Sequence, residues 1–440
     1  MRITFILPSI GRKINYAYPN SWLMEPLCIS MLSAFTPYGI EKKFYDDRIE
    51  KIPFDAPTDL VAINAETYTA KRAYQIADHY RRKNVPVIFG GFHATLMSEE
   101  VLQNADSVMI GEAEGTWNEV LKDFSSNKLK PRYESKERPQ LKGLRPDRLI
   151  YKDKKYQKIS LVETGRGCFF DCEFCSIAGF YKSTYSARPV EEVIEEIKSL
   201  DNKNIFFVDD NLCVDLNRAK QFFEALIPLK IRWMGQVSIN ISNNSELLNI
   251  MHKSGCIGVL IGFETLEPMH LAKMNKTMNP ETLIDYENAI NNFYKFNIAI
   301  YATFVFGYDS DTEDLFKKTL DFAIKNKFFF TAFNHLVPFP GTRLYERLKL
   351  ENRLMNDPWW LNDQYKFGDV AFKPKQMSAE KLALLCFEYR KKFYSLSSLF
   401  KRISKSNCNS LFKSFLYFAQ NIYAKKDVSL RQGLTLGMKN

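Results

Sequence analysis

The residues of this 440-residue chain that say most about chemistry are three closely spaced cysteines, Cys168, Cys172 and Cys175. Structural zinc sites and fully protein-ligated iron-sulfur clusters take four protein ligands, whereas this spacing supplies three. One iron of a four-iron cluster held here would therefore keep an open coordination position, where a small molecule can bind. A structural zinc site that takes a fourth cysteine from elsewhere is the alternative, although zinc sites favour two Cys-x2-Cys pairs.

The order Cys-x3-Cys-x-aromatic-Cys, in which Phe174 is the aromatic residue, resembles the signature of radical S-adenosylmethionine (SAM) enzymes. The neighbouring sequence agrees, because residues 159–164 are typical of a buried strand before the loop and residues 188–192 open a helix after it. The resemblance implies that the three thiolates hold a [4Fe-4S] cluster, that SAM binds the fourth iron and that Phe174 belongs to the SAM site. It also implies an electron donor such as flavodoxin or ferredoxin.

Length and composition allow two domains, or one large barrel with an appendage, since 45% of the residues are hydrophobic. The first apolar run is too short for a signal sequence, and no stretch approaches the roughly 18 apolar residues of a membrane span. Eight cysteines, three of them clustered, do not resemble a secreted disulfide framework. We therefore expect a cytoplasmic protein.

The first ~125 residues alternate short apolar runs with helical patterns, as in a doubly wound parallel sheet. Strands are predicted at 3–7, 43–45, 60–63, 85–89 and 107–110, and helices at 25–35, 69–82, 98–103 and 114–124. This α/β rhythm predicts a flavodoxin-like (Rossmann-like) topology. Ligands of such sheets lie outside the carboxyl ends of the strands, where the chain carries Asn64, Thr67, Gly90, Gly91, His93, Gly111 and Glu112.

The order of these pieces resembles the cobalamin-binding domain that precedes the radical SAM core in one subfamily, which includes anaerobic magnesium-protoporphyrin cyclases and hopanoid methylases. The matching fragments are Glu25-Pro26-Leu27, Tyr45-Asp46-Asp47, Gly90-Gly91-x-His93 and Gly111-Glu112-x-Glu114. The resemblance implies that the seven strand-end residues bind cobalamin, with His93 as a hydrogen-bond donor near the nucleotide tail. Residues 46–50 lack the histidine that binds cobalt in methionine-synthase-like domains, so we expect cobalamin bound with its own base displaced and without a protein histidine on cobalt. A similar fold without a cofactor is the alternative.

Residues 128–157 are polar, basic and proline-containing, which predicts a linker. From residue 158 the α/β rhythm restarts, with strands predicted at 159–164, 205–208, 231–237, 257–263, 298–306 and 328–336. Helices are predicted between them at 190–200, 218–227, 245–252, 280–292 and 312–324. Six strand-helix units predict a partial (β/α)6 TIM-type barrel, the fold that radical SAM enzymes share. We therefore divide the chain into segments 1–127, 128–157, 158–350 and 351–440.

Residues at the carboxyl ends of barrel strands carry the chemistry of barrel enzymes. Here these are Asp209, Asp210 and Asn211 after the second predicted strand, Gln236 and Ser238 after the third, and Glu264 after the fourth. The resemblance implies that they bind SAM, and a carboxylate can accept hydrogen bonds from its ammonium group. The alternatives are a helix cap for the first group and a structural polar network for the others.

The two resemblances together imply a cobalamin-dependent radical SAM methyltransferase. It would generate a 5'-deoxyadenosyl radical and methylate an unactivated carbon of a small-molecule or lipid-like substrate. The same cofactors used for cyclisation, rearrangement or oxidation are the first alternative, and the sequence does not separate the two. RNA modification is a further alternative, although the chain lacks the extra N-terminal cysteines and the β-rich RNA-binding domain of methylthiotransferases. A non-catalytic binding protein is disfavoured, because an open iron has little use in a scaffold.

The C-terminal segment carries the excess positive charge. Residues 390–440 hold eleven Lys and Arg and one acidic residue, Asp427, which accounts for the whole formal charge of +10. Apolar residues recur there at helical spacing on a basic background. Such a helix can lie on an anionic membrane, or it can pack against the barrel and leave a basic face in water.

Overall fold

The N-terminal region is a six-stranded parallel sheet. The structure is a computed structural model that describes residues 1–13, 18–135, 137–267, 285–404 and 411–438. The sheet has the order β2-β1-β3-β4-β5-β6, all parallel. Its strands are β1 Arg2–Leu7, β2 Glu41–Asp46, β3 Leu60–Asn64, β4 Val87–Gly90, β5 Ser107–Ile110 and β6 Arg132–Glu134. The five predicted strands are present, and their order is the one that a flavodoxin-like fold requires.

Helices cover both faces of this sheet, so its central strands are apolar throughout. They are α1 Leu27–Phe35, α2 Ala70–Arg81, α3 Phe92–Leu96, α4 Ser98–Asn104 and α5 Trp117–Ser125. The short helix α3 was not predicted. It starts directly after Gly91, whose φ of 97° lies in the left-handed region that favours glycine. A Cβ at Gly91 would come within 2.6 Å of the Asn64 Oδ1 atom, so this turn requires glycine.

The segment predicted as a linker, 128–157, has more structure than its composition indicates. It supplies the edge strand β6, which pairs with β5. Tyr133, Leu141, Leu144 and Tyr151 are buried against the N-terminal region. A few apolar residues spaced along a polar segment do not produce a periodic pattern, so this packing could not be predicted from the sequence.

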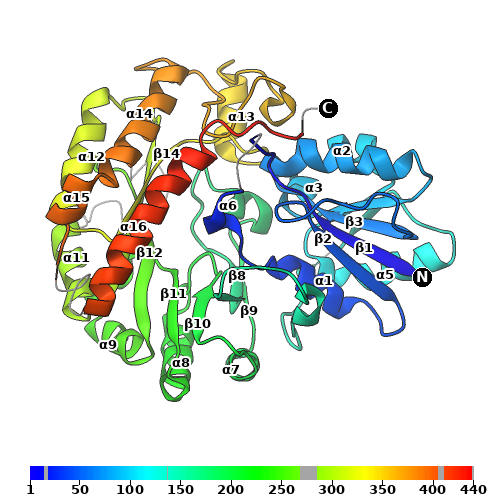
Figure 1. Cartoon of the computed structure of the whole chain (residues 1–440), viewed down its shortest axis with the longest axis horizontal. Coiled ribbons are helices and arrows are strands. Elements are labelled where there is room, and N and C mark those ends of the chain that lie inside the picture. Colours follow the sequence, from blue (N-terminus) through cyan, green and yellow to red (C-terminus); the bar gives the residue numbers. More distant parts are fainter. Residues whose placement is uncertain (14–17, 136, 268–284, 405–410, 439–440) are drawn as a thin grey trace.

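The second region contains a six-stranded parallel sheet that curves into part of a barrel (Figure 1). Its order is β14-β13-β12-β11-β10-β7, and all six predicted strands are present. The strands are β7 Ser160–Val162, β10 Asn204–Phe207, β11 Arg232–Gln236, β12 Cys256–Glu264, β13 Ala299–Phe306 and β14 Phe330–His335. A separate antiparallel hairpin, β8 Gly165–Gly167 with β9 Tyr185–Ala187, flanks the three cysteines.

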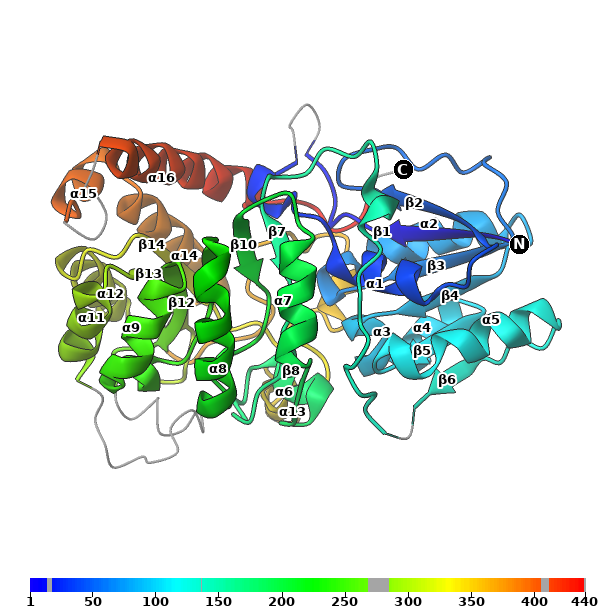
Figure 2. The ribbon, with the colours of Figure 1, turned by 90° about the horizontal axis from the view of Figure 1, so that it is seen from below.

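The connecting helices lie on the convex side of this sheet, as Figure 2 shows for α7 to α9, α11 and α12. They are α7 Val190–Lys198, α8 Leu216–Leu226, α9 Ser245–Lys253, α11 Tyr286–Lys295 and α12 Glu313–Lys325. Two further helices, α6 Ser176–Tyr181 and α13 Arg343–Leu350, lie at the cysteine loop instead. The helix predicted at 280–292 falls partly on residues 280–284, which are outside the described residues.

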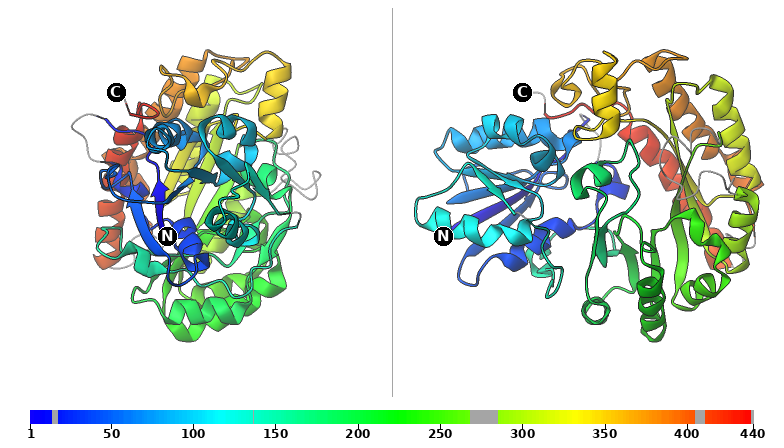
Figure 3. Two further views of the ribbon diagram at one scale, coloured as in Figure 1. Left: turned by 90° about the vertical axis from the view of Figure 1, so that its right-hand side faces the viewer. Right: turned by 180° about the vertical axis from the view of Figure 1, so that it is seen from behind.

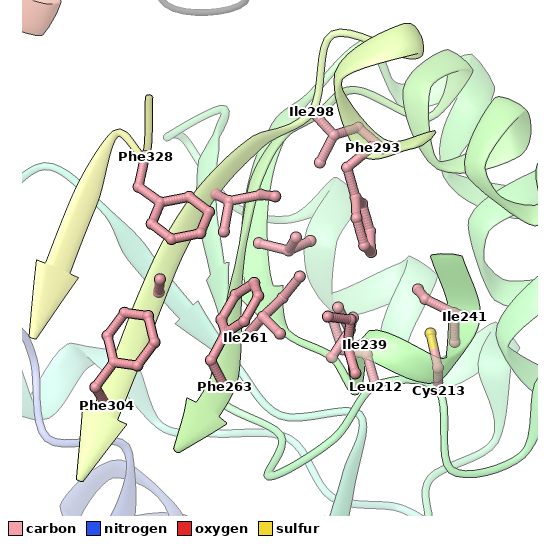
Figure 4. Close-up of a cluster of buried hydrophobic side chains, with 14 of the residues drawn as sticks. Leu212, Cys213, Ile239, Ile241, Ile261, Phe263, Phe293, Ile298, Phe304 and Phe328 are labelled. Carbon is pink, nitrogen blue, oxygen red and sulfur yellow. The ribbon is translucent and has the colours of Figure 1, made fainter. Parts of the chain in front are cut away.

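The side chains of the barrel strands alternate between two environments. One set is fully buried against the helices: Ile261, Phe263 and Phe304 join Phe293 of α11 in a single core cluster (Figure 4). The other set, which includes Phe206, Met234, Tyr301 and Val305, is only partly buried and lines a cavity. A closed TIM barrel fills its interior with side chains. This open barrel leaves its interior free for a ligand.

Three helices follow the barrel: α14 Ala379–Phe393, α15 Leu396–Lys401 and α16 Leu411–Arg431. Helix α16, red in Figure 1, crosses the concave side of the barrel sheet and ends beside the N-terminal region. The view from behind in Figure 3 shows the same helix through the space between the two sheets. Within the described part of the chain, no helix combines the length with the hydropathy that a bilayer crossing needs.

Candidate functional site

The three cysteines lie on one loop between the hairpin strand β8 and helix α6, and all three are half-buried. Cys175 is the N-cap residue of α6, and the backbone amides of Ile177 and Ala178 face its sulfur. Burial raises the pKa of the Cys175 thiol, and the nearby Cys168 adds to this rise. Iron binds the thiolate form, so metal binding here must release a proton.

The donor set fits a cluster better than a single ion. Among the described residues, no group of three or more Cys, His, Asp or Glu side chains is gathered tightly enough to hold one metal ion. The thiolates of a cluster each bind a different iron, so they need only surround a shared volume. Cys213 and Cys256, two of the cysteines outside the loop, are buried among core side chains and cannot serve as a fourth zinc ligand there. Burial raises the pKa of Cys213 to about 12.

Two arginines of α13 hold the cysteine loop from one side, and sequence reasoning missed them. Arg347 Nε lies 2.5 Å from Glu173 Oε1, and Arg343 Nη2 lies 3.1 Å from Asp171 Oδ2. The backbone amide of Leu344 also donates to the Glu173 carbonyl at 3.0 Å. The acidic residues between the cysteines, and the arginines after the Pro338–Thr342 turn, were the only signals for this contact, and neither specifies a partner.

Arg166 holds the loop from the other side. Its guanidinium lies within 2.8 Å of Glu163, 3.2 Å of Glu112 and 2.7 Å of Glu114, all largely buried. Glu112 also pairs with Arg138 at 2.8 Å. Glu112 and Glu114 follow β5 of the first sheet, so these ion pairs join the strand ends of the N-terminal region to the residue two positions before Cys168.

Helix α3 adds an apolar contact at the same junction. Phe92 stacks on Phe180 of α6 with ring centroids 4.3 Å apart. Gly179 of α6 packs on the turn before α13, where a Cβ would come within 2.7 Å of the Gly341 carbonyl oxygen. The carboxyl ends of the first sheet therefore face the cysteine loop directly.

The Asp209-Asp210-Asn211 group lies beside this loop, and all three members accept hydrogen bonds from the protein. Asp209 is buried and accepts hydrogen bonds from the Thr164 amide at 2.9 Å and the Thr164 hydroxyl at 2.6 Å. Burial raises its pKa to about 6. Asp210 is half-buried and accepts from the Gly167 amide at 2.8 Å, whereas Asn211 accepts from the Cys213 amide. Asp210 is thus the member of the group that a ligand can reach.

The remaining predicted SAM residues lie at strand ends, as expected. Gln236 ends β11 and is exposed, and Ser238 follows it and is half-buried. Glu264 ends β12 with a φ of 62°, in the left-handed region, next to a register shift between β12 and β13. Irregular strand ends of this kind redirect a side chain and are common near active sites.

The predicted cobalamin residues fall into two groups. Gly90 and Gly111 end or follow their strands and have open space where a Cβ would stand, so a large ligand can approach the backbone there. Asn64 ends β3, and Thr67 is buried just behind it. These residues fit a group that is held through backbone contacts at a sheet edge.

His93 and Glu112 are differently placed from what the sequence indicated. His93 is fully buried, with Nε2 3.1 Å from both the Tyr74 hydroxyl and Glu100 Oε1 and Nδ1 3.4 Å from the Thr67 hydroxyl. In this arrangement its ring is closed off from solvent and joins Tyr74, Glu100 and Thr67 in the domain interior. Glu112 is likewise engaged by Arg138 and Arg166, as described above.

Asp46 and Asp47, at the position where related domains carry a cobalt-binding histidine, also have internal partners. Asp46 pairs with Arg48 at 2.7 Å, and Asp47 pairs with Arg72 at 2.9 Å. These pairs hold the loop after β2 in place. The loop contains no histidine that could reach a ligand at the sheet edge.

A cavity of about 760 Å³ lies between the two sheets and the C-terminal helices. Its walls include Met24 and Tyr68 from the N-terminal region, Phe174 from the cysteine loop and the half-buried side chains of the barrel strands. Helices α14 and α16 close it on the far side. Most of the wall is aromatic or aliphatic, and the volume lies in the range of ligand sites for small molecules.

Comparisons with known proteins agree with this architecture. The family model described as the radical SAM superfamily matches residues 162–323. The bacteriochlorophyllide d C-12(1)-methyltransferase of Chlorobaculum tepidum is 30% identical over 414 residues, which cover 91% of this chain and 89% of that protein. The anaerobic magnesium-protoporphyrin IX monomethyl ester cyclase of Cereibacter sphaeroides is 24% identical over 457 residues, covering 91% and 71%.

Among solved structures, the cobalamin-dependent SAM radical enzyme OxsB, with aqua-cobalamin and SAM bound, superposes with a TM-score of 0.68 at 14% identity. The match covers 97% of this chain and 72% of OxsB, and it extends the shared fold through both sheets. This chain belongs to the radical SAM superfamily, in the subfamily whose radical SAM core follows a cobalamin-binding domain.

Proposed function

We propose that this protein is a cobalamin-dependent radical SAM methyltransferase that methylates an unactivated carbon of a small, largely apolar substrate. One observation carries the proposal. The carboxyl ends of the N-terminal sheet and the cysteine loop of the barrel meet at one junction. The cavity reaches both regions, with Tyr68 of the N-terminal region and Phe174 of the cysteine loop in its wall. A methyl carrier on one sheet and a radical source in the other can act on the same substrate only with such an arrangement.

In this proposal Cys168, Cys172 and Cys175 hold the cluster, and Phe174, Asp210 and Gln236 contact SAM, with Ser238 and Glu264 beside them. When bound, the cluster and SAM supply a radical that removes a hydrogen atom from the substrate, and cobalamin supplies the methyl group. The chain's own residues bind, orient and exclude water. Asp209 and Asn211 act indirectly, because they fix the backbone of residues 164 and 213.

Cobalamin would be held over the first sheet by the backbone around Gly90 and Gly111, with Asn64 at the strand end. Asp46 is already paired with Arg48. This pairing is consistent with cobalamin that has no protein histidine on cobalt. His93 would then stabilise this edge of the sheet from the domain interior, because its ring contacts both Thr67 and Tyr74.

For the substrate we propose a tetrapyrrole or a ring system of similar size. The relatives named above act on bacteriochlorophyllide d and magnesium-protoporphyrin IX monomethyl ester. The aromatic cavity walls, among them Phe206, Tyr301 and Phe330, favour a broad apolar ring.

The test is an anaerobic assay with bacteriochlorophyllide d as the probe. The protein is purified with cobalamin, its iron, sulfide and corrin contents are measured, and the products of SAM are quantified. Methyl transfer yields both S-adenosylhomocysteine and 5'-deoxyadenosine. Cys172→Ala should lose both products, whereas Cys213→Ala, which removes a buried thiol away from the loop, should keep them. Full cluster content and normal SAM cleavage in Cys172→Ala would refute the proposal.

A cyclisation or oxidation without methyl transfer is the second candidate. The similarity to the cyclase over 91% of this chain favours it. It predicts 5'-deoxyadenosine without S-adenosylhomocysteine in the same assay, so one measurement separates the two candidates. Either reaction requires a one-electron donor of the flavodoxin or ferredoxin type, which can be tested by replacing dithionite with such a protein.

The C-terminal helices support a peripheral membrane contact, which suits an apolar substrate. One face of α15 and α16 is packed, with Leu399 and Tyr417 buried, whereas Phe400, Leu411 and Phe415 are 63%, 93% and 71% exposed. No acidic residue occurs between positions 389 and 426. Flotation with anionic but not zwitterionic vesicles is expected, and Phe415→Ser should weaken it. If the floating fraction contained the same amount of protein with and without anionic vesicles, the membrane contact would be refuted.

A further inference from the structure

Two arginines line the large cavity without a matching number of acidic partners. Arg390 comes from α14 and Arg431 from the end of α16. The two lie close enough that Arg390 lowers the pKa of Arg431, although burial is the larger cause of that decrease. A pair of neighbouring guanidinium groups in a mostly apolar wall is unusual, because partly buried charges are normally paired.

Arg390 has hydrogen-bond partners for only part of its guanidinium. Its Nη2 donates to the Phe333 carbonyl and, at 3.0 Å, to Asn334 Oδ1. Its Nε is buried and has no partner. Within the described ranges no carboxylate forms an ion pair with Arg390.

Arg431 is better placed but still incompletely paired. Its Nη2 contacts the Ser21 hydroxyl and lies 3.5 Å from Asp427 Oδ2, and its guanidinium stacks over Trp22 at 4.7 Å. Its Nε is also buried without a partner. The Asp427 carboxylate is shared, because it accepts a hydrogen bond from the Ser21 amide at 3.0 Å.

The net charge at this end of the cavity is one positive charge. Two arginines face the single carboxylate of Asp427. The third basic candidate, His335, stays neutral near pH 7, because burial lowers its pKa. Tyr394 in the same wall is neutral there as well, because burial raises its pKa.

We propose that Arg390 and Arg431 form an anion subsite that binds a carboxylate on a large apolar ring substrate. A single carboxylate balances the one excess charge, whereas a phosphate dianion would leave an excess negative charge in an apolar wall. A ligand anchored there extends along the aromatic wall toward Phe174 beside the cysteine loop. This inference rests on the function proposed above for the identity of the substrate. The binding test of the subsite does not depend on that function.

The test uses a matched fluorescent pair, 1-pyrenebutyric acid and its methyl ester, with the full-length protein purified anaerobically. Both probes share the apolar ring, and only the acid carries a carboxylate. The wild-type protein should bind the acid about tenfold or more tightly than the ester at pH 7, since hydrogen bonds to charged groups are the stronger ones. Arg390→Gln should abolish this preference by weakening the acid alone.

Three variants make the result specific. Arg390→Lys should keep part of the preference, because it keeps the charge but loses the planar fork. Arg431→Gln should reduce the preference in the same direction as Arg390→Gln. Lys392→Gln, an exposed position two residues along the same helix, should leave both affinities unchanged. Unchanged ester binding in each variant reports that the cavity is intact.

Equal binding of acid and ester by the wild-type protein would overturn the subsite, as would an acid preference that survives in Arg390→Gln. The subsite would also be overturned if 1-pyrenebutyric acid did not bind to the wild-type protein. None of these readouts needs the cluster, SAM or methyl transfer. The subsite can therefore fail while the methyltransferase assay succeeds, and the reverse.

Discussion

The ion pairs between α13 and the cysteine loop allow a quantitative prediction about the cluster. Glu173 lies between Cys172 and Cys175, and Arg347 contacts it through Nε at 2.5 Å and Nη2 at 3.4 Å. The Arg347 side chain is 33% exposed and that of Glu173 is 22% exposed. Arg347→Gln should therefore loosen the loop and weaken cluster retention.

The burial of the Arg347–Glu173 pair sets the size of its energetic contribution. Exposed ion pairs contribute about 0.2–1 kcal/mol, and hydrogen bonds to charged groups about 1.5–3 kcal/mol. A half-buried pair with two contacts should lie between these ranges, at about 1.5 kcal/mol. If this energy is realised only when the loop is ordered around the cluster, its loss corresponds to about a tenfold change in cluster affinity.

Arg343 offers a matched control on the same helix and the same loop. Its partner is Asp171, but the two side chains are 51% and 52% exposed. Water screens such a pair, so Arg343→Gln should change cluster retention by about twofold or less. The comparison separates loop positioning from a general effect of removing positive charge.

The assay follows loss of the cluster absorbance after addition of a ferrous chelator under anaerobic conditions. The half-time should shorten by about tenfold in Arg347→Gln and by about twofold or less in Arg343→Gln. A third variant, Arg347→Lys, should fall between the wild type and Arg347→Gln. If both glutamine variants lost iron at the wild-type rate, or if Arg343→Gln had the larger effect, the reasoning from burial would be wrong.

Three further predictions concern single groups. The Cys213 thiol, with its pKa raised to about 12 by burial, should resist iodoacetamide at pH 8, and a modified Cys213 peptide in mass spectra of the native protein would contradict this. Tyr74→Phe removes the hydroxyl that donates to Glu100 at 2.7 Å, so it should lower the free energy of unfolding by about 1–2 kcal/mol in urea titrations. Burial raises the pKa of Asp209 from 3.8 to about 6, so the folded state binds this proton more tightly than the unfolded state. The stability contributed by the proton is complete below pH 3.8 and is lost as the pH rises through 6, by about 3 kcal/mol. Asp209→Asn should lack that loss, and parallel pH profiles of unfolding for the two proteins would refute the assignment.

Local sequence patterns were sufficient to predict five of the six strands of the first sheet and all six strands of the second. Runs such as residues 298–306 alternate between a buried and a half-buried face, and helices such as α12 repeat their apolar residues at helical spacing. Both signals are carried by neighbouring residues. The strand order then follows from the short helical connections between parallel strands.

Elements that depend on distant partners escaped this reasoning. Helix α3 has five residues and no apolar period, and it exists because Gly91 turns the chain over Asn64. Strand β6 lies in a polar segment and is held by pairing with β5. In each case the stabilising contact comes from residues far away in the sequence or from a single backbone conformation.

The candidate site divides in the same way. The spacing of Cys168, Cys172 and Cys175 is a local property, and it specifies three ligands on one loop whatever surrounds them. Placing His93 at a ligand surface required knowledge of what covers it, and the fold covers it with Tyr74 and Glu100.

The amino-acid sequence by itself determined the class of this protein, because ligand spacing and strand-helix periodicity are written in consecutive residues. Only the tertiary structure decided which charges hold the cysteine loop and which face the cavity. The contact of Arg347 with Glu173 spans 174 positions of the chain. The partly unpaired Arg390 becomes significant only where α14 and α16 close the barrel. Electrostatic pairing depends on distance and burial, and both arise when remote segments pack together.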